Sequence, residues 1–519
     1  MIAGLLATTL TVSAVDDPVF PPARHDPEGN LLPLQSYGET IQRGMKFLLE
    51  DQENWAKGNT IKDEEGRLRP PYFFYAVTFN GNGQLEEGID EGWRQTAYPA
   101  GHHAIYINCF LNYYAYSGNA KALQQAEELA VWNMAHSTPT NWCYGGLPYS
   151  TARRGQVGGD QTENAGKMGH MDGDATMTDK AAIMADAYLR LYQVTRRPEY
   201  LQAAQRIAAT LARTQLPAGN WPFRVEPKIG VVREPYTSSA IYAVMLFESL
   251  DRLTGQKTFK VAKDKAFTWL WNGPIRDMNW NGFYEDIGAN PKNRNNHDCI
   301  DTARYLVVHR ADNKEFLPAA LRLVDWVRKT FVDEKHQYSP APAVREQLVC
   351  NYRMSAHTGH WAQLLGCLYE ATGDAKYRVE MLNAASLITY HLQSDNRVSL
   401  SPEWKEGAHR NWWYSISFGT MRALIDILGY CPETAPGNEN HILCYQVPVR
   451  EVAYRSTSVA YTTDATSSET LKLAFVPARI TVNGVPLAPG NGTTEGWKYD
   501  PGTHILRLAH QGGTVAVCE

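Results

Sequence analysis

A ten-residue pattern recurs along this chain and constrains its fold more than any other feature. LYEATGDAKY at 368–377 has close relatives at 113–122, 191–200 and 250–259, and a looser copy at 307–316. In the clearest copy, Gly373 can take the left-handed conformation that ends a helix, and Asp374 can cap the next helix. A connection this short makes its two helices antiparallel. The pattern therefore predicts repeated helical hairpins.

The copies are evenly spaced. Aligned turn positions fall at 117, 195, 254, 311 and 372, so after the first gap the period is about sixty residues. A fixed period of this kind is typical of repeat architectures.

The two helices of each hairpin differ in character. Residues 179–194 are apolar on nearly every face and rich in Ala, which predicts a helix packed on both sides. Residues 199–214 instead carry one apolar stripe (Leu201, Ala204, Ile207, Ala208, Leu211) opposite Gln202, Gln205, Arg206 and Arg213. Each hairpin is therefore expected to run from an inner helix to an outer helix.

Six such pairs can be counted. Inner helices are expected to begin near 102, 177, 237, 299, 355 and 412, and outer helices near 37, 119, 198, 257, 314 and 374. Six pairs can close into a ring, and over residues 35–430 the pattern resembles the α/α six-hairpin barrel, or toroid, of carbohydrate-active enzymes. An open solenoid is the alternative. The count of six pairs, and the unequal lengths of the connections at the end opposite the tight turns, favour a closed ring.

The chain changes character after a Pro/Gly/Asn-rich linker at 432–441. Residues 442–519 contain short β-type runs separated by turn residues, which predicts a small, antiparallel, β-sandwich-like domain. WKYDPGTHILRLAH resembles the C-terminal β modules of many glycan-processing enzymes. The expected role of this domain is structural, covering one end of the barrel formed by residues 16–431.

The N-terminus and composition indicate where the protein acts and which partners it lacks. Residues 1–15 hold a short apolar stretch ending in VSA, as in a cleavable signal peptide, so a secreted or periplasmic protein is expected; an arbitrary apolar N-terminus is the alternative. No other stretch reads as transmembrane. A net charge of −5 argues against a nucleic-acid partner. The eight Cys show no zinc-ligand spacing, and their pairing stays open.

The ring places its tight turns at one end and its long connections at the other. These connections, at 53–101, 136–176, 215–236, 273–298, 332–354 and 392–411, are of a length that is usually functional. They lead into the N-termini of the inner helices, which favour anionic groups. Eight of the 14 Trp lie in or beside them: Trp55, Trp93, Trp142, Trp221, Trp280, Trp404, Trp412 and Trp413. Such rings can stack on sugars, or can fasten the loops to the barrel.

Glycoside hydrolysis needs two carboxyl groups, one of them kept protonated by burial or by an acidic neighbour. Asp172 and Asp174 are only two residues apart, so each is an acidic neighbour that could keep the other protonated. HMDGDATM at 170–177 resembles the Asp-Gly element, with a nearby Met, that precedes an inner helix in unsaturated uronyl hydrolases. The resemblance implies that Asp172 is the catalytic acid, with Asp174 as substitute. His-Met replaces the usual aromatic residue before that Asp, which leaves the subclass open, and helix capping or bound Ca²⁺ is the alternative for both.

The second carboxylate is expected at Glu285 or Asp286. The stretch from 277 partly matches a calcium loop, with Gly282 in the turn, but Gly288 stands where the closing Glu belongs. We therefore expect no required cofactor and no catalytic metal, and only a weak case for structural Ca²⁺.

Arginines on neighbouring loops bear on the substrate. A guanidinium binds a carboxylate bidentately, so Arg224, Arg294, Arg345 and Arg353 would suit a uronic acid. Salt bridges between loops are the alternative for each. The further residues expected to bind substrate are His170, Trp221, Trp280, Tyr352, Trp412 and Trp413.

Three functions remain in competition. The resemblance to β-glucuronidases and unsaturated uronyl hydrolases implies an exo-acting glycoside hydrolase on a uronate-containing oligo- or polysaccharide. A polysaccharide lyase is second, because NRNNHD at 293–298 resembles the Asn-His element of toroidal lyases; His297 with Tyr236 or Tyr352 would then be base and acid. The small β domain favours the hydrolase. A non-catalytic glycan-binding protein is third and accounts less well for the acids. Sugar, linkage and oligomeric state stay open.

Overall fold

The structure is a computed structural model that describes residues 21–51, 66–67, 69–73, 99–150, 176–282, 293–333, 339–349, 353–401 and 413–519. The predicted signal peptide lies outside these ranges. Within them, no helix combines the length and the apolar character needed to cross a membrane, and seven cysteines are free thiols.

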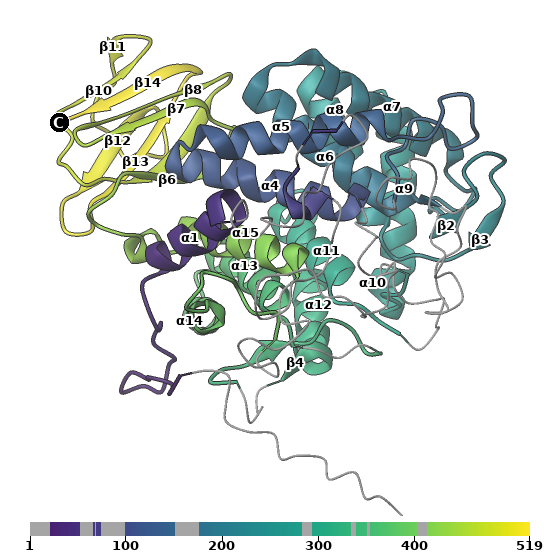
Figure 1. Ribbon diagram of the computed structural model, residues 1–519, viewed down its shortest axis with the longest axis horizontal. Coiled ribbons are helices and arrows are strands. Elements are labelled where there is room, and N and C mark those ends of the chain that lie inside the picture. The colour runs from purple at the N-terminus through teal and green to yellow at the C-terminus, as the bar shows by residue number, and fades with distance from the viewer. Residues whose placement is uncertain are drawn as a thin grey trace, which may run out of the picture.

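Two layers of helices form a closed α/α barrel (Figure 1). The inner helices are α4 (Pro99–Ser117), α6 (Thr178–Thr195), α8 (Ala240–Thr254), α11 (His297–Val308), α13 (Ser355–Thr372) and α15 (Tyr414–Tyr430). The outer helices are α1 (Tyr37–Lys46), α5 (Ala120–Ala135), α7 (Pro198–Thr214), α9 (Lys260–Asn272), α12 (Phe316–Phe331) and α14 (Ala375–His391). Each inner helix packs on the next in this order, and α15 packs on α4. The prediction of ring closure is therefore confirmed.

The predicted turns explain the hairpins. Gly118, Arg196, Gly255 and Gly373 all follow an inner helix with φ between 61° and 70°, the left-handed conformation that ends a helix. The Asp374 carboxylate then accepts a hydrogen bond from the Lys376 backbone N–H at 3.0 Å, as expected for a cap. The fifth copy has no glycine, and its α11–α12 connection runs from 309 to 315.

Burial follows the two predicted helix types. No residue of α6 is exposed and most are buried, whereas α7 buries one stripe that includes Tyr200, Ala204, Ile207 and Leu211. The first and last inner helices are joined by stacking of Tyr106 on Phe418, with ring centroids 4.2 Å apart. This contact closes the core of the ring.

The C-terminal strands form two antiparallel sheets beside the barrel (Figure 1). One has the order β11-β10-β14-β8-β7 and the other β12-β13-β9-β6. Their bounds are β6 (His441–Tyr445), β7 (Arg450–Arg455), β8 (Ser458–Thr463), β9 (Ser467–Lys472), β10 (Arg479–Val482), β11 (Val485–Pro486), β12 (Gly496–Asp500), β13 (Ile505–His510) and β14 (Gly513–Cys518). Alternate residues such as Val459, Tyr461, Leu506 and Leu508 are buried between them.

These sheets cover the tight-turn end of the barrel. Strand β6 packs on α4 and α15. The His441 ring stacks on Tyr116 with centroids 3.9 Å apart, and the Tyr454 hydroxyl donates to the Ala115 carbonyl at 2.5 Å. The opposite end, where the inner helices begin, is left to the long connections. These include the ribbon β1 (Thr176–Met177), β2 (Arg224–Val225), β3 (Val232–Glu234) and the pair β4 (Val332–Asp333), β5 (Ala343–Val344).

Candidate functional site

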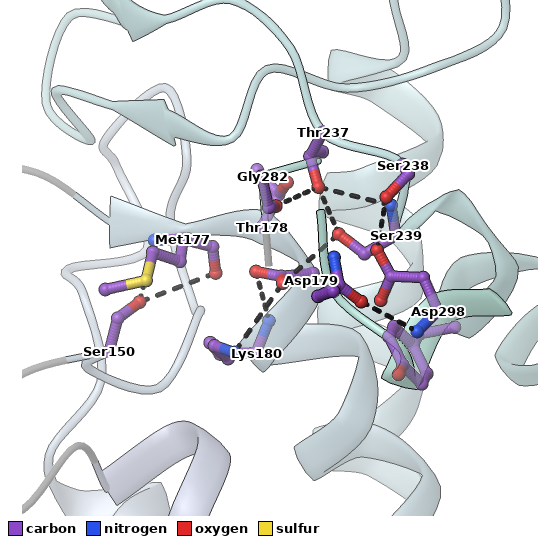
Figure 2. A network of polar contacts seen from close by, with 12 residues as sticks. Ser150, Met177, Thr178, Asp179, Lys180, Thr237, Ser238, Ser239, Gly282 and Asp298 are labelled. Atoms are coloured by element: carbon purple, nitrogen blue, oxygen red, sulfur yellow. Dashed lines mark hydrogen bonds and ion pairs between the residues drawn. The ribbon is translucent and has the colours of Figure 1, made fainter. Parts of the chain in front are cut away.

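Three inner helices begin side by side around one polar network at the long-connection end of the barrel (Figure 2). Asp179 is the second residue of α6, Ser239 precedes α8, and Asp298 is the second residue of α11. Acidic side chains in the first turn of a helix are favoured by the helix dipole. Two carboxyl groups thus lie at the N-termini of α6 and α11, the helices on either side of α8.

Hydroxyl groups from the segment before α8 orient both acids (Figure 2). The Ser238 Oγ donates to Asp298 Oδ2, and the Ser239 Oγ donates to Asp179 Oδ2 at 3.2 Å. The Thr237 hydroxyl bonds to Ser239 and to the Gly282 carbonyl. The segment is thereby held between the two carboxyl groups.

The two acids lie in unequal surroundings. Burial raises the pKa of Asp298 to about 8, helped by the nearby Asp179 charge and opposed by the Ser238 hydrogen bond. Asp298 is fully buried, and its Oδ1 has no hydrogen-bond partner among the described residues. The Lys180 Nζ lies 3.8 Å from Asp179 Oδ2 and supplies a buried positive charge there. Asp298 is therefore a protonated acid at neutral pH beside a carboxylate paired with a cation.

A cluster of histidines adjoins this network along α11 and α13. His297 and Asp301 share one face of α11 because they are four residues apart. The His360 Nε2 lies 2.9 Å from Asp301 Oδ1, and the Tyr242 hydroxyl donates to Asp301 Oδ2 at 3.1 Å. The His297 ring centroid is 4.5 Å from that of His357 and 4.9 Å from that of His360.

Burial fixes the protonation of this histidine cluster. It lowers the pKa of His297 well below its ordinary value and that of His357 to about 3, so both imidazoles are neutral at pH 7. Burial alone would raise the pKa of Asp301, but His360 and Arg304 more than offset it and hold that pKa well below its usual range. Burial, with the Asp301 charge, raises the pKa of the Tyr242 phenol well above its ordinary value. The cluster therefore combines neutral bases with an ionised carboxylate.

The same cluster is where a metal ion could bind. His297, Asp301 and His360 offer three ligand atoms within 4.8 Å of one another. Imidazole and carboxylate suit several divalent transition metals. However, His360 and Asp301 already share a hydrogen bond, and Arg304 Nη1 lies 3.7 Å from Asp301 Oδ1. The Asp301 carboxylate is thus already paired, whereas the buried His360 Nδ1 has no hydrogen-bond partner among the described residues.

Several residues assigned from the sequence fall outside the described ranges. These are Asp172, Asp174, Glu285, Asp286, His170, Tyr352 and Trp412, and their roles stay predictions. His297 lies in the histidine cluster, as described above. The Tyr236 hydroxyl donates to the Asn279 carbonyl at 2.8 Å, so it is engaged by the backbone, and its role as the base or acid of a lyase stays a prediction.

The four arginines expected to bind a uronate all contact neighbouring loop groups. Arg224 is buried and pairs with Glu234 across β2 and β3. Arg345 Nε and Arg353 Nη2 both approach Asp333 Oδ2, at 3.7 Å and 2.6 Å. Arg294 donates to the Asn293 carbonyl at 2.7 Å. The structure brings Arg345 and Arg353 together, in the salt-bridged arrangement that the sequence left open, and the uronate role of all four stays a prediction.

Three of the tryptophans expected to bind substrate also pack against the protein itself. Trp280 is 0% exposed and Trp221 is 3% exposed, with its indole N–H donating to the Leu211 carbonyl at 2.8 Å. Their ring faces are covered, so these two fasten loops to the barrel, as the alternative interpretation had it. Trp413 is half-buried against Met354, Leu400 and Ile416.

Sequence reasoning missed much of the site. Asp179, Lys180, Ser239 and Tyr242 were not singled out, and neither were His357 and His360 on α13. Two signals were present. Asp179 stands at the start of a helix that is apolar on nearly every face, and His357 and His360 lie three residues apart on a largely apolar helix.

Comparisons with known proteins support the fold. No family model and no curated protein matches the chain. Among solved structures, a D-mannose isomerase is 14% identical with a TM-score of 0.54, over 76% of this chain and 96% of that one. A sugar epimerase from a ruminal bacterium is 14% identical with a TM-score of 0.49, over 74% and 98%. An unsaturated glucuronyl hydrolase specific for heparin is 11% identical with a TM-score of 0.45, over 74% and 96%. At these identities, the match to the isomerase shows a shared α/α-barrel fold.

Proposed function

We propose that this protein is a glycoside hydrolase that acts on uronate-containing oligo- or polysaccharides, and that Asp298 and Asp179 form its acid/base pair. One observation carries the proposal. Asp298 is protonated at neutral pH and has an unpartnered Oδ1 among the described residues, while a second carboxyl group, that of Asp179, lies on the other side of α8, at the start of α6, and is paired with Lys180. Two carboxyl groups whose surroundings separate their protonation are what glycosidic bond cleavage needs.

In this mechanism Asp298 donates its proton to the oxygen of the leaving sugar as the glycosidic bond breaks. Asp179 acts on the opposite side of the sugar, as the base for water or as the nucleophile. Lys180 favours the charged form of Asp179, and the Ser239 hydroxyl holds its Oδ2 in place. Ser238 does the same for Asp298.

The substrate class depends on the loops. The sequence resemblance implies an exo-acting, β-glucuronidase-like enzyme. Arg345 and Arg353 converge on the Asp333 carboxylate, so this pair of guanidinium groups is arranged to hold a carboxylate, which supports a uronate as the substrate class. The N-terminal pattern supports action outside the cytoplasm, in the periplasm or after secretion.

The histidine cluster favours a second function. His297 is neutral at pH 7 and lies beside the ionised Asp301 and the Asp301–His360 hydrogen bond. A neutral imidazole can remove a proton from a sugar carbon. That step belongs to isomerisation, the activity named for the D-mannose isomerase of this fold, and to β-elimination next to a uronate.

One experiment separates these reactions. The protein is incubated in D₂O with hyaluronan, polygalacturonate and D-mannose, and three signals are followed: reducing ends, absorbance near the ultraviolet edge, and deuterium in the sugar. The proposal expects new reducing ends from a uronate polymer, with no double bond and no deuterium on carbon. Deuterium incorporation or a rise in ultraviolet absorbance would establish the second function instead.

A further inference from the structure

A surface loop on the outer side of the barrel is held rigidly between a helix and a hairpin. We call residues 139–146 the outer loop. The Thr210 hydroxyl of α7 donates to the Gly145 carbonyl at 2.8 Å, and the backbone N–H groups of Cys143 and Tyr144 donate to the carbonyls of Lys228 and Pro227. A Cβ at Gly145 would lie 2.6 Å from the Thr140 carbonyl oxygen, so the turn requires glycine. The shape of the outer loop is therefore set in advance of any binding.

Two pockets, each of about 510 Å³, flank the outer loop and share Thr140. We call them the helix pocket, between α5, α6 and α7, and the hairpin pocket, beside residues 229–230. Their described linings contain two arginines, Arg206 and Arg213, and no acidic side chain. An anionic ligand would therefore be attracted electrostatically to both pockets.

The helix pocket contains an unsatisfied buried hydroxyl. Tyr188 is 1% exposed, and its hydroxyl has no hydrogen-bond partner among the described residues. A buried polar group without a partner is unusual, and a bound ligand is one way to satisfy it. Arg206 lines the same pocket, is exposed, and forms no ion pair within the described part of the chain.

The hairpin pocket adds an aromatic ring. It is lined by the half-buried Trp142 and by Ile229, which is 68% exposed. One Arg213 nitrogen donates to the Cys143 carbonyl at 3.0 Å and to the Thr210 hydroxyl at 3.4 Å. A guanidinium carries five N–H groups, so the other nitrogens remain for a ligand. An indole with a neighbouring cation suits the apolar face of an acidic sugar.

The two arginines are spaced along one helix. Arg206 and Arg213 are seven residues apart on α7, close to two turns, so they lie on one side of it about 10.5 Å apart along the axis. This is close to the length of one disaccharide. A polymer with a carboxylate on every second sugar would therefore place successive carboxylates near both guanidinium groups.

We propose that the outer loop and its two pockets form a secondary binding site for an anionic oligosaccharide, with carboxylates on Arg206 and Arg213 and a sugar ring on Trp142. The inference rests on the uronate substrate of the proposed function. The site is separate from Asp179 and Asp298, because neither residue, and none of the hydroxyl groups that bind them, lines either pocket. Holding a polymer here raises its effective concentration at the barrel mouth.

Affinity electrophoresis of the full chain tests the site, with hyaluronan in the gel as probe and neutral dextran as reference. Hyaluronan should retard the unmodified protein and dextran should not. Arg206→Ala/Arg213→Ala should weaken the affinity for hyaluronan about tenfold or more, since it removes two charge-assisted contacts. Trp142→Ala should weaken it as well.

The matched control is Arg322→Ala/Lys329→Ala, which removes two exposed cations with the same seven-residue spacing from the outer helix α12. It should be retarded like the unmodified protein. Three results would overturn the site: no retardation of the unmodified protein, unchanged retardation of the Arg206/Arg213 variant, or equal loss in the control.

The rate on p-nitrophenyl β-D-glucuronide separates this inference from the proposed function. That substrate is too small to reach the outer loop, so Arg206→Ala/Arg213→Ala should hydrolyse it at the unmodified rate while losing hyaluronan binding. Loss of retardation in a protein that hydrolyses no uronate substrate would uphold the site and reject the function. Hydrolysis of a uronate substrate, together with unchanged retardation of the Arg206→Ala/Arg213→Ala variant, would uphold the function and reject the site.

Discussion

At the scale of single residues, the surroundings of a carboxyl group decide its chemistry more than its type does. Asp298 and Asp301 are three residues apart on α11, yet burial raises the pKa of Asp298 to about 8, whereas His360 and Arg304 hold that of Asp301 well below its usual range. One is a proton donor at neutral pH and the other a fixed negative charge. The proposed reaction depends on that difference.

Replacing Asp298 by Asn should abolish most of the activity while keeping the shape of the side chain. The amide cannot give up a proton, and general acid catalysis contributes about 10²–10⁴ in rate, so kcat/KM should fall about 100-fold or more. Steady-state kinetics on the best uronate substrate measures this. Asp277→Asn, at an exposed acid on α10 (Pro274–Asp277), is the control and should keep full activity. Full activity in Asp298→Asn would remove this residue from the mechanism.

The same variant should also change the pH dependence of stability. The folded-state pKa of Asp298 is raised from 3.8 to about 8, so folding binds a proton that the unfolded chain releases. The resulting stabilisation is complete below the unfolded pKa and is lost as pH rises through about 8. Between about pH 5 and about pH 8, urea denaturation should show the unmodified protein losing stability relative to Asp298→Asn. A constant difference would mean that Asp298 is ionised in the folded protein.

At the scale of elements, the helical hairpins depend on one backbone conformation that recurs. Four inner helices end in a left-handed residue, three times with glycine and once with Arg196. The non-glycine case shows that the conformation is imposed by the packing of the two helices, since a side chain there is disfavoured by about 1–2 kcal/mol. The recurring pattern thus reflects the need for a left-handed residue at the end of the helix, and glycine adopts that conformation at the lowest free-energy cost.

Gly373→Ala should destabilise the protein by about 1 kcal/mol, because Gly373 has φ 70° and nothing lies within 4 Å of the added Cβ, so the cost is purely conformational. Gly437→Ala is the matched control: that position also has open space but no positive φ, and it should be neutral or slightly stabilising. The free energy of unfolding in urea measures both. Equal effects of the two changes would contradict a left-handed turn at Gly373.

At the scale of the whole molecule, the barrel is closed at the turn end by the C-terminal sheets. Tyr454 bridges the two parts: its hydroxyl donates to the Ala115 carbonyl of α4 and accepts from the Ile442 backbone N–H at 2.8 Å. His441 on β6 adds its stacking on Tyr116. The sheets therefore complete the burial of inner-helix ends that the barrel leaves uncovered.

Tyr454→Phe should lower the free energy of unfolding by about 1–3 kcal/mol, because it leaves a carbonyl and an N–H unpaired at this junction. Tyr499→Phe is the control, since the contacts of the Tyr499 hydroxyl with described residues are long, 3.5 Å to the Phe475 carbonyl and 3.3 Å to His504 Nδ1. Thermal and urea unfolding compare the two. A Tyr454→Phe protein as stable as the control would mean that the sheets do not support the barrel.

The sequence by itself determined the helical hairpins, their number, the inner and outer helix types and the strands that follow. These features are local: a capping residue such as Asp374, or the stripe of α7, acts within one or two turns of helix. The loops were harder to interpret, because Trp221 and Trp280 are of a residue type that suits a sugar site but are buried in the folded protein.

Only the tertiary structure decided which side chains meet and how they are charged. His297 and His360 are far apart in the chain and come together because α11 packs on α13, and Asp298 keeps its proton because α6, α8 and the 237–239 segment exclude water from it. Burial and the distance between charges are properties of the packed barrel, and a linear pattern of residue types does not contain them.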